Sequence, residues 1–256
     1  MNNKKKNTSW GNVAVWYREY LEDENSYQSQ VILPQLLRIL EIKRGETVLD
    51  LACGTGFFSE VFHAEGARVV GIDIGPELIA LAKQHASPEI RFSVAPAHKL
   101  GALQDATIDK IVIVLAIQNI KEVKEMLDEC KRVLKPGGSV VIVMNHPAYR
   151  VPGGSSWGWD EKVNQQYRRV DQYLSEKTVE IAMHPGKDPH KKTVSFHRSL
   201  QYYAKLARNA GFAMTRLEEW ISHKASETGP RQKAEDRIRK EIPLFLMLEL
   251  TPYLKV

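Results

Sequence analysis

Cysteine is scarce in this chain: among its 256 residues only Cys53 and Cys130 occur. A secreted fold held by disulfides usually carries more, so this count predicts residence in a reducing compartment. The sequence also lacks a Cys-x-x-Cys pair and any Cys/His cluster with metal-ligand spacing. We therefore expect no bound metal.

Long apolar runs are lacking too. No uninterrupted stretch approaches the roughly 18 residues of a membrane span, and no apolar run follows Lys4, Lys5 and Lys6, as it would in a signal peptide. Apolar residues make up 43% and charged residues 26%, which is ordinary for a globular chain. The net charge of +5 is too mild to indicate a nucleic-acid partner. The expectation is a soluble, cytoplasmic protein without a membrane span.

A regular alternation of apolar strands and amphipathic helices begins after residue 46. The strands are expected at 47–52, 68–73, 90–95, 108–115 and 139–145, and the helices at 57–65, 76–85 and 121–134. Strands separated by helices of this length form β-α-β units, and such units build a parallel sheet with helices on both faces. The pattern predicts an α/β, doubly wound fold.

The segments around this core follow other patterns. Two helices are expected before it, at 10–21 and about 31–40. The alternation breaks at Pro147, after which we expect a polar helix containing Arg168 and Arg169, and a hairpin of 178–183 with 192–196. A helix, a strand, a charged helix and a last strand follow at 199–210, 213–220, 230–240 and 243–250. The predicted organisation is a tail with lid helices (1–44), a main domain (45–147 and 197–256) and an inserted cap (148–196).

A glycine pair, Gly54 and Gly56, lies between the first strand and helix of the core. Glycine has no Cβ and tolerates unusual dihedral angles, so such a loop lets a ligand approach the backbone. Taken alone the pair is a weak signal, because turn glycines also occur without a ligand.

Three further features narrow the ligand. Asp50, four residues before Gly54, can meet the charged amino end of an amino-acid ligand, whereas a pyrophosphate needs N–H groups there. Asp73, 17 residues after Gly56, ends the second strand, where an acid accepts hydrogen bonds from ribose hydroxyls. The third glycine of a dinucleotide loop would fall at Ser59. The combination favours a nucleoside without phosphate over NAD(P) or FAD.

These motifs carry a family resemblance. Val48-Leu-Asp-Leu-Ala-Cys-Gly-Thr-Gly56, Gly71-Ile-Asp-Ile74 and Arg132-Val-Leu-Lys-Pro-Gly-Gly138 resemble the class I S-adenosylmethionine (SAM) dependent methyltransferases. The likeness is to the ubiquinone/menaquinone-type, small-molecule branch, and it covers about residues 30–147. It implies a Rossmann-like, seven-stranded sheet, mostly parallel with an antiparallel last strand, and SAM as cofactor with S-adenosylhomocysteine as product.

The resemblance also implies roles for individual residues. Asp73 would hold the ribose, and Leu115 would cover the cofactor beside the substrate. The family often has an acid near the adenine amino group after its third strand, but this sequence has Pro96-Ala97-His98 there, so adenine would rely on the backbone of Ala97 and on His98. The remaining implied cofactor contacts are Asp50, Ala52, Gly54 and Gly56 at the methionine half and Ile74 at the adenine.

Site residues are expected where the strands at 108–115 and 139–145 end, beside the cofactor crevice. His146 directly follows the second of these strands. A histidine there can act as a general base near neutral pH, or it can hydrogen-bond locally and shape the turn before Pro147. Candidates for contact with the substrate come from the lid helices and the cap, with plain packing as the alternative for each: Tyr17, Tyr27, Trp157, Arg168 and His197.

The leading functional hypothesis is a methyltransferase acting on a small-molecule substrate enclosed by the lid helices and the cap. An RNA- or protein-modifying methyltransferase is the alternative, because Arg168, Arg169 and the region 231–240 offer a basic track. Glu235 and Asp236 interrupt that track, and a helix of both signs is usually a solvated face. A third possibility is a SAM-fold protein without catalysis. The intact set Asp50, Gly54, Gly56 and Asp73 argues against it.

Overall fold

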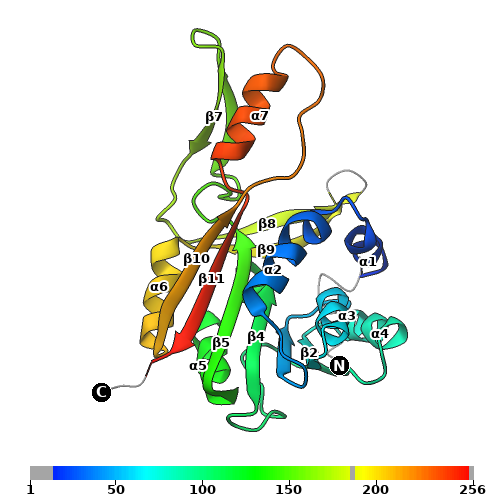
Figure 1. Ribbon diagram of the computed structural model, residues 1–256. Helices are drawn as coiled ribbons and strands as arrows, with labels where there is room; N and C mark the ends of the chain where they lie inside the picture. Colours follow the sequence, from blue (N-terminus) through cyan, green and yellow to red (C-terminus); the bar gives the residue numbers. More distant parts are fainter. Residues whose placement is uncertain (1–13, 185–187, 254–256) are drawn as a thin grey trace, which may run out of the picture.

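A seven-stranded sheet organises the computed structural model, which describes residues 14–184 and 188–253 (Figure 1). Its strand order is β10-β11-β5-β4-β1-β2-β3. All neighbours pair in parallel except β11, which runs antiparallel to both β5 and β10. The strands are β1 (Thr47–Leu51), β2 (Arg68–Asp73), β3 (Arg91–Val94), β4 (Ile108–Val114), β5 (Leu134–Asn145), β10 (Phe212–Trp220) and β11 (Phe245–Pro252). The predicted fold class is confirmed.

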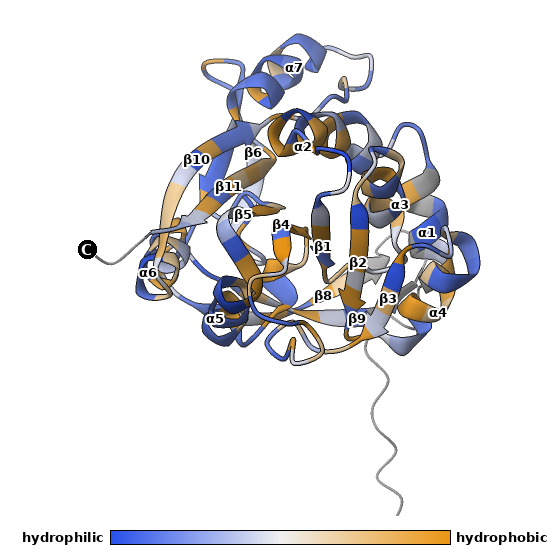
Figure 2. Cartoon of the chain, turned by 60° about the horizontal axis from the view of Figure 1, so that its bottom comes forward, coloured by the Kyte–Doolittle hydropathy of each residue, from blue (hydrophilic) through white to orange (hydrophobic). Residues whose placement is uncertain are grey.

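Helices cover both faces of this sheet (Figure 2). Two buried apolar clusters result, one between the sheet and α5 with α6, the other between the sheet and α2, α3 and α4. Strands β1 and β4 contribute to both clusters, because alternate side chains of a strand point to opposite faces. The helices are α2 (Leu33–Leu40), α3 (Phe57–Ala64), α4 (Pro76–His85), α5 (Val123–Val133) and α6 (Leu200–Asn209).

The N-terminal helices form as expected within the described residues. Helix α1 spans Ala14–Glu22, and a short π-helical turn, η2 (Gln28–Ile32), leads into α2. The π-helical turn was not predicted, because the apolar spacing at 31–40 indicates only a helix. Among the described residues, none of the helices combines the length and the apolar character needed to cross a bilayer.

The prediction of a polar helix around Arg168 and Arg169 is wrong. Those residues lie on β7 (Gln165–Val170), which pairs antiparallel with β6 (Ser155–Asp160). The pairing places Trp157 opposite Arg168, whose guanidinium carbon lies 4.9 Å from the centre of the Trp157 ring. Local polarity suggested a helix, but cross-strand pairs of this kind stabilise a hairpin.

The second hairpin is confirmed: β8 (Lys177–His184) pairs antiparallel with β9 (Asp188–His197). Strand β9 contacts η3 (Ile117–Asn119), a 3₁₀ turn that follows β4. The turn η3 lies at the carboxyl end of β4, on the edge of the sheet where the parallel strands end. The hairpin therefore lies over the edge where a ligand site is expected.

Helix α7 (Gln232–Glu241) lies beside β7, far along the chain from it (Figure 1). The guanidinium carbon of Arg231 lies 4.5 Å from the ring centre of Trp159, and Arg231 also pairs with Glu161. We call β6, β7 and α7 together the outer lobe. The sequence analysis assigned α7 to the main domain, since nothing local showed its contact with the hairpin.

Candidate functional site

A cavity of about 440 Å³ opens where β1, β2 and β4 end. It has the size of a small-molecule site, and a doubly wound sheet binds its ligands at this edge. Of the predicted cofactor residues, the cavity brings together Asp50, Ala52, Gly54, Asp73, Ile74, Ala97, His98 and Leu115.

The loop after β1 has an unusual backbone. Ala52, Gly54 and Gly56 have φ angles of 63°, 58° and 83°, in the region that favours glycine. Ala52 keeps this conformation because its N–H donates to the carbonyl of Ile72, at 2.7 Å. Gly56 does not line the cavity. It precedes α3, where a Cβ would come within 2.9 Å of the Phe92 ring, so its role is to let the loop pack closely.

Asp50 lies at the floor of the cavity with only 2% of its surface exposed. Burial raises the pKa of its carboxyl to about 7, opposed by a hydrogen bond from the Ser59 hydroxyl, at 2.6 Å. The nearby Asp73 carboxylate adds to the rise. Ser59, which the sequence analysis treated only as a missing glycine, therefore orients the acid. A cationic ligand would compensate this buried charge.

The Asp73 carboxylate is held by two backbone amides. Gly54 N–H donates to Oδ2 at 2.9 Å and Gly75 N–H donates to Oδ1 at 2.7 Å. Burial raises the pKa of Asp73, while these N–H groups lower it. Each carboxylate oxygen keeps further lone-pair capacity, and the side chain lines the cavity. Asp73 is thus an oriented acceptor for two neighbouring hydroxyl groups.

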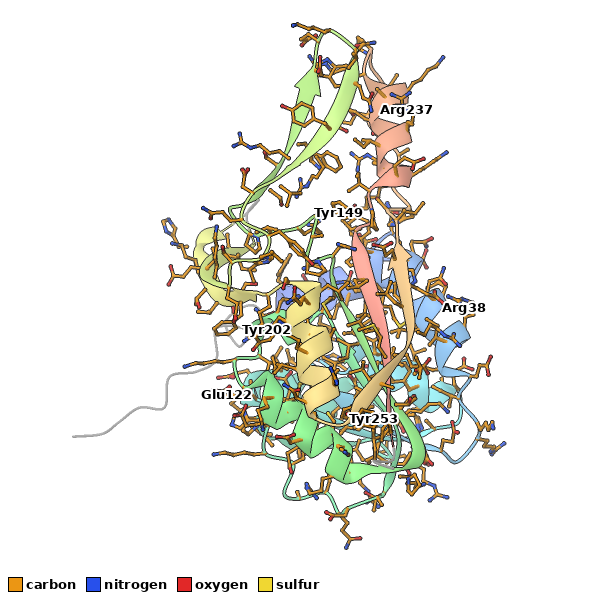
Figure 3. The ribbon with its side chains drawn as sticks, turned by 90° about the vertical axis from the view of Figure 1, so that its left-hand side faces the viewer. Arg38, Glu122, Tyr149, Tyr202, Arg237 and Tyr253 are labelled. Atoms are coloured by element: carbon orange, nitrogen blue, oxygen red, sulfur yellow. The ribbon has the colours of Figure 1, made fainter. Side chains whose placement is uncertain are left out.

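The far end of the cavity is lined by Ile74, Ala97 and His98. An acid is present here after all, but it comes from another segment: Glu122, just before α5, has its Oε2 3.8 Å from Nδ1 of His98. Glu122 also lines the cavity, and Figure 3 labels it at the start of α5. Sequence reasoning missed this residue because it looked for the acid only after the third strand.

The hairpin β8–β9 covers another side of the cavity. Thr193, Val194 and Phe196 of β9 line it, and the Asn119 side-chain amide donates to the Val194 carbonyl at 2.8 Å. Leu115, directly after β4, has a φ of 52° and also lines the cavity. Strained non-glycine backbone at two places around one cavity, Ala52 and Leu115, is typical of functional sites.

Helix α1 lies against the glycine loop. The Arg18 guanidinium donates to the Thr55 carbonyl at 3.1 Å and pairs with Glu60 at 3.3 Å, and the buried Leu21 lines the cavity. This contact supports a lid role for the helix. The side chain of Tyr17, the predicted lid residue, lies outside the described part of the chain.

His146 lies away from the cavity and is 5% exposed. Its Nδ1 accepts from the Ala148 N–H at 3.2 Å, and its Nε2 lies 2.7 Å from Glu219 Oε1. These contacts fit a neutral ring that donates from Nε2, and burial lowers its pKa. Neither nitrogen is then available to a substrate. The geometry supports the second of the two interpretations above, a histidine that shapes the turn.

The other predicted substrate contacts lie outside the large cavity. Tyr27 contacts Ser222 and His223. Trp157 lies on the outer lobe, where Arg168 covers its ring and donates to the Tyr149 carbonyl. His197 is buried, with Nε2 2.8 Å from the Tyr173 carbonyl, and lines a second, smaller cavity.

The class of protein follows from this geometry: a sheet with an antiparallel β11, a glycine loop after β1, and acids that end β1 and β2 are features of the class I SAM-dependent methyltransferases. Over its core, the chain is similar to this superfamily. Residues 49–142 match the family model of the methyltransferase domain.

Particular relatives agree with this assignment. Ubiquinone biosynthesis O-methyltransferases from Xylella fastidiosa (strain 9a5c) and Xanthomonas oryzae pv. oryzae (strain PXO99A) are 33% and 32% identical over 101 residues. The match covers 38% of this chain but only 41% and 42% of those proteins. A solved SAM-dependent methyltransferase from Mesorhizobium loti is similar in fold, with a TM-score of 0.69 and 25% identity, covering 85% of this chain and 95% of that one.

Proposed function

We propose that the chain transfers the methyl group of SAM to a small molecule. The observation that carries the proposal is the pair of buried acids in one cavity, Asp50 and Asp73, each oriented by fixed donors. The cavity is lined on all its named sides by the core, β9 and α1, which favours a compact acceptor over a macromolecule. The ubiquinone O-methyltransferase relatives support the same substrate class, although they match over less than half of their length.

The residues of the cavity fit SAM. Asp50 would compensate the ammonium group of the methionine half, and Asp73 would accept hydrogen bonds from both ribose hydroxyls. Ile74, Ala97 and His98 would surround the adenine, with Glu122 close to His98. When bound, SAM supplies an electrophilic methyl group. The contribution of the chain would be to orient the reactants and to exclude water, and β9 and Leu21 of α1 line the cavity where they would do so.

Two free thiols, Cys53 and Cys130, support residence in the reducing cytoplasm. Burial raises the pKa of both. A thiol kept protonated is a poor nucleophile, so we assign neither cysteine a covalent role in the transfer.

The proposed function is tested by methyl transfer from tritium-labelled SAM to three acceptor fractions: low-molecular-weight metabolites, bulk RNA and protein. We expect label in the first fraction only. Label in RNA that falls steeply as salt rises would favour the alternative acceptor, because phosphate-driven binding is salt-dependent. No transfer to any fraction by a protein that binds S-adenosylhomocysteine would contradict the proposal.

Arg18→Met should weaken the binding of S-adenosylhomocysteine about tenfold, because loss of the charge-assisted contacts of Arg18 with Thr55 and Glu60 costs about 1.4 kcal/mol. The measurement is calorimetric titration of the wild type, Arg18→Met, Glu60→Gln and the double variant. If Arg18 acts through Glu60, the two single losses will not add. Unchanged affinity in Arg18→Met would show that α1 does not close the site.

A further inference from the structure

A second cavity of about 80 Å³ lies beside the cofactor cavity and has no role in the function proposed above. It has room for roughly five water molecules, the size of a small polar group with its adjoining atoms. Its walls come from the turn after β4, the end of β5 with the turn that follows, and strand β9 with the start of α6. It is therefore placed where an acceptor beside the methyl group would reach.

Some polar groups in this cavity are already engaged. Arg198 donates to the carbonyls of Ile120 and Lys121 at 2.8 and 3.0 Å, and His197 contacts the Tyr173 carbonyl. A cation and a buried acceptor, by contrast, have no partner in the part of the chain that the structure describes. Among the described residues, the Arg150 guanidinium has neither an ion-pair nor a hydrogen-bond partner, and the buried Oε1 of Gln118 accepts no hydrogen bond.

A second arginine lies near Arg150. The charge of Arg150 lowers the pKa of Arg168, and Arg168 donates to neutral oxygens, the Tyr149 carbonyl at 2.7 Å and the Ser155 hydroxyl at 2.6 Å. Burial lowers the pKa of both guanidinium groups, yet arginine stays protonated near neutral pH. Two cations thus share one region in which no carboxylate from residues 14–184 or 188–253 pairs with them, and an anion from outside would compensate both.

The turn that carries Arg150 is rigidly held. The backbone N–H of Arg150 donates to the His146 carbonyl at 2.9 Å. The His146 ring in turn is hydrogen-bonded to the Ala148 N–H and to the Glu219 carboxylate. Figure 3 shows the neighbouring Tyr149 between the outer lobe and the sheet. Neighbouring atoms crowd the Arg150 guanidinium enough to lower its pKa, but the residue as a whole is exposed, so a ligand can reach it without the protein opening. His146 is thereby a positioning residue for this cation.

The two cavities are connected by shared elements. Phe196 of β9 lines both. Gln118 lines the second cavity, and its side-chain nitrogen donates to the carbonyl of Leu115, which lines the first, at 2.8 Å. The side chain that carries the unpartnered acceptor is therefore bonded to the backbone that borders the cofactor cavity.

We propose that the second cavity binds a carboxylate group of the methyl acceptor, with Arg150 as its cation and Gln118 Oε1 accepting from a hydroxyl or amine on the same molecule. The substrate class is then a small hydroxy or amino acid rather than a neutral molecule. This inference rests on the proposed function, because it treats the cavity as part of the acceptor site. A bidentate guanidinium–carboxylate pair is the chemistry that this geometry favours.

The probes are 3-hydroxybenzoate and its neutral analogue of nearly equal shape, 3-hydroxybenzamide. Each is titrated, with ligand-detected NMR, into protein saturated with S-adenosylhomocysteine. We expect the wild type to bind the acid at least about tenfold more tightly than the amide. Arg150→Gln should abolish that preference and leave the amide affinity unchanged, and Arg150→Lys should retain part of it.

Arg169→Gln is the matched control, because Arg169 is the neighbour of Arg168 on β7 but already pairs with Asp171 at 2.9 Å. It should behave as the wild type. Equal binding of acid and amide, no detectable binding of the acid, or a preference that survives Arg150→Gln would each overturn the proposal. Failure of S-adenosylhomocysteine to bind at all would instead overturn the proposed function, so the two failures are distinguishable.

Discussion

Replacing Asp73 by alanine is expected to lower the affinity for S-adenosylhomocysteine by at least about 100-fold, because two hydrogen bonds to a charged acceptor contribute about 1.5–3 kcal/mol each. The carboxylate also organises the loop: both of its oxygens accept backbone N–H groups, from Gly54 and Gly75. Alanine leaves these donors without their partner and loosens the backbone that borders the cavity. Calorimetric titration measures the affinity.

The control for this variant is Asp128→Ala. Asp128 is an exposed acid on α5 that pairs with Lys124, so its loss changes the net charge equally without touching the cavity. Thermal unfolding of both variants separates a loss of binding from a loss of folded protein. Binding of S-adenosylhomocysteine by Asp73→Ala at wild-type affinity would refute the assignment of the cavity to the nucleoside.

Asp50→Asn should make the ligand-free protein more stable at pH 8 and less able to bind SAM. Burial raises the folded-state pKa of Asp50 from 3.8 to about 7. Between these two values the unfolded chain has lost the proton that the folded chain keeps, so the contribution of this group to stability falls as pH rises. Above about pH 7 the free energy of unfolding is therefore lower by up to about 4 kcal/mol than it would be with an unshifted Asp50 pKa.

Asparagine carries no charge and can still accept the hydrogen bond from Ser59, so it avoids this loss. Urea unfolding should show Asp50→Asn more stable than the wild type by about 2–4 kcal/mol at pH 8 and by less at pH 5. Its affinity for SAM should fall about tenfold, since the ammonium group loses its counter-charge. A variant that is no more stable than the wild type at pH 8 would show that Asp50 is not the buried acid described.

How far the sequence predicted the structure depended on the range of the interactions. The core strands and helices were placed within a few residues, because each is specified by its own apolar periodicity. Helix α4, for example, spans the predicted Pro76–His85. The error at Arg168 arose where the sequence has no such periodicity: β6 and β7 are specified by cross-strand pairs and by packing against α7, which lies far along the chain.

The candidate site divides in the same way. Asp50, Gly54 and Asp73 belong to short motifs and were predicted from their spacing. Glu122 and the β9 residues reach the cavity from distant segments, and no local pattern distinguishes them from surface residues. For His146 the sequence left two interpretations open, and only the positions of Ala148 and Glu219 distinguish between them.

By itself, the sequence determined the resemblance to the class I methyltransferases and the kind of ligand proposed for the large cavity, because a glycine loop and two strand-end acids are local features that a parallel sheet brings to one edge. The tertiary structure alone decided the rest. Burial, with a smaller contribution from the Asp73 carboxylate, gives Asp50 its raised pKa against the opposing hydrogen bond from Ser59. The turn held by His146 brings Arg150 to the same cavity as Gln118, and within the described part of the chain no carboxylate pairs with it. Burial and charge balance are sums over contacts between segments far apart in the chain, so they arise only when the chain folds.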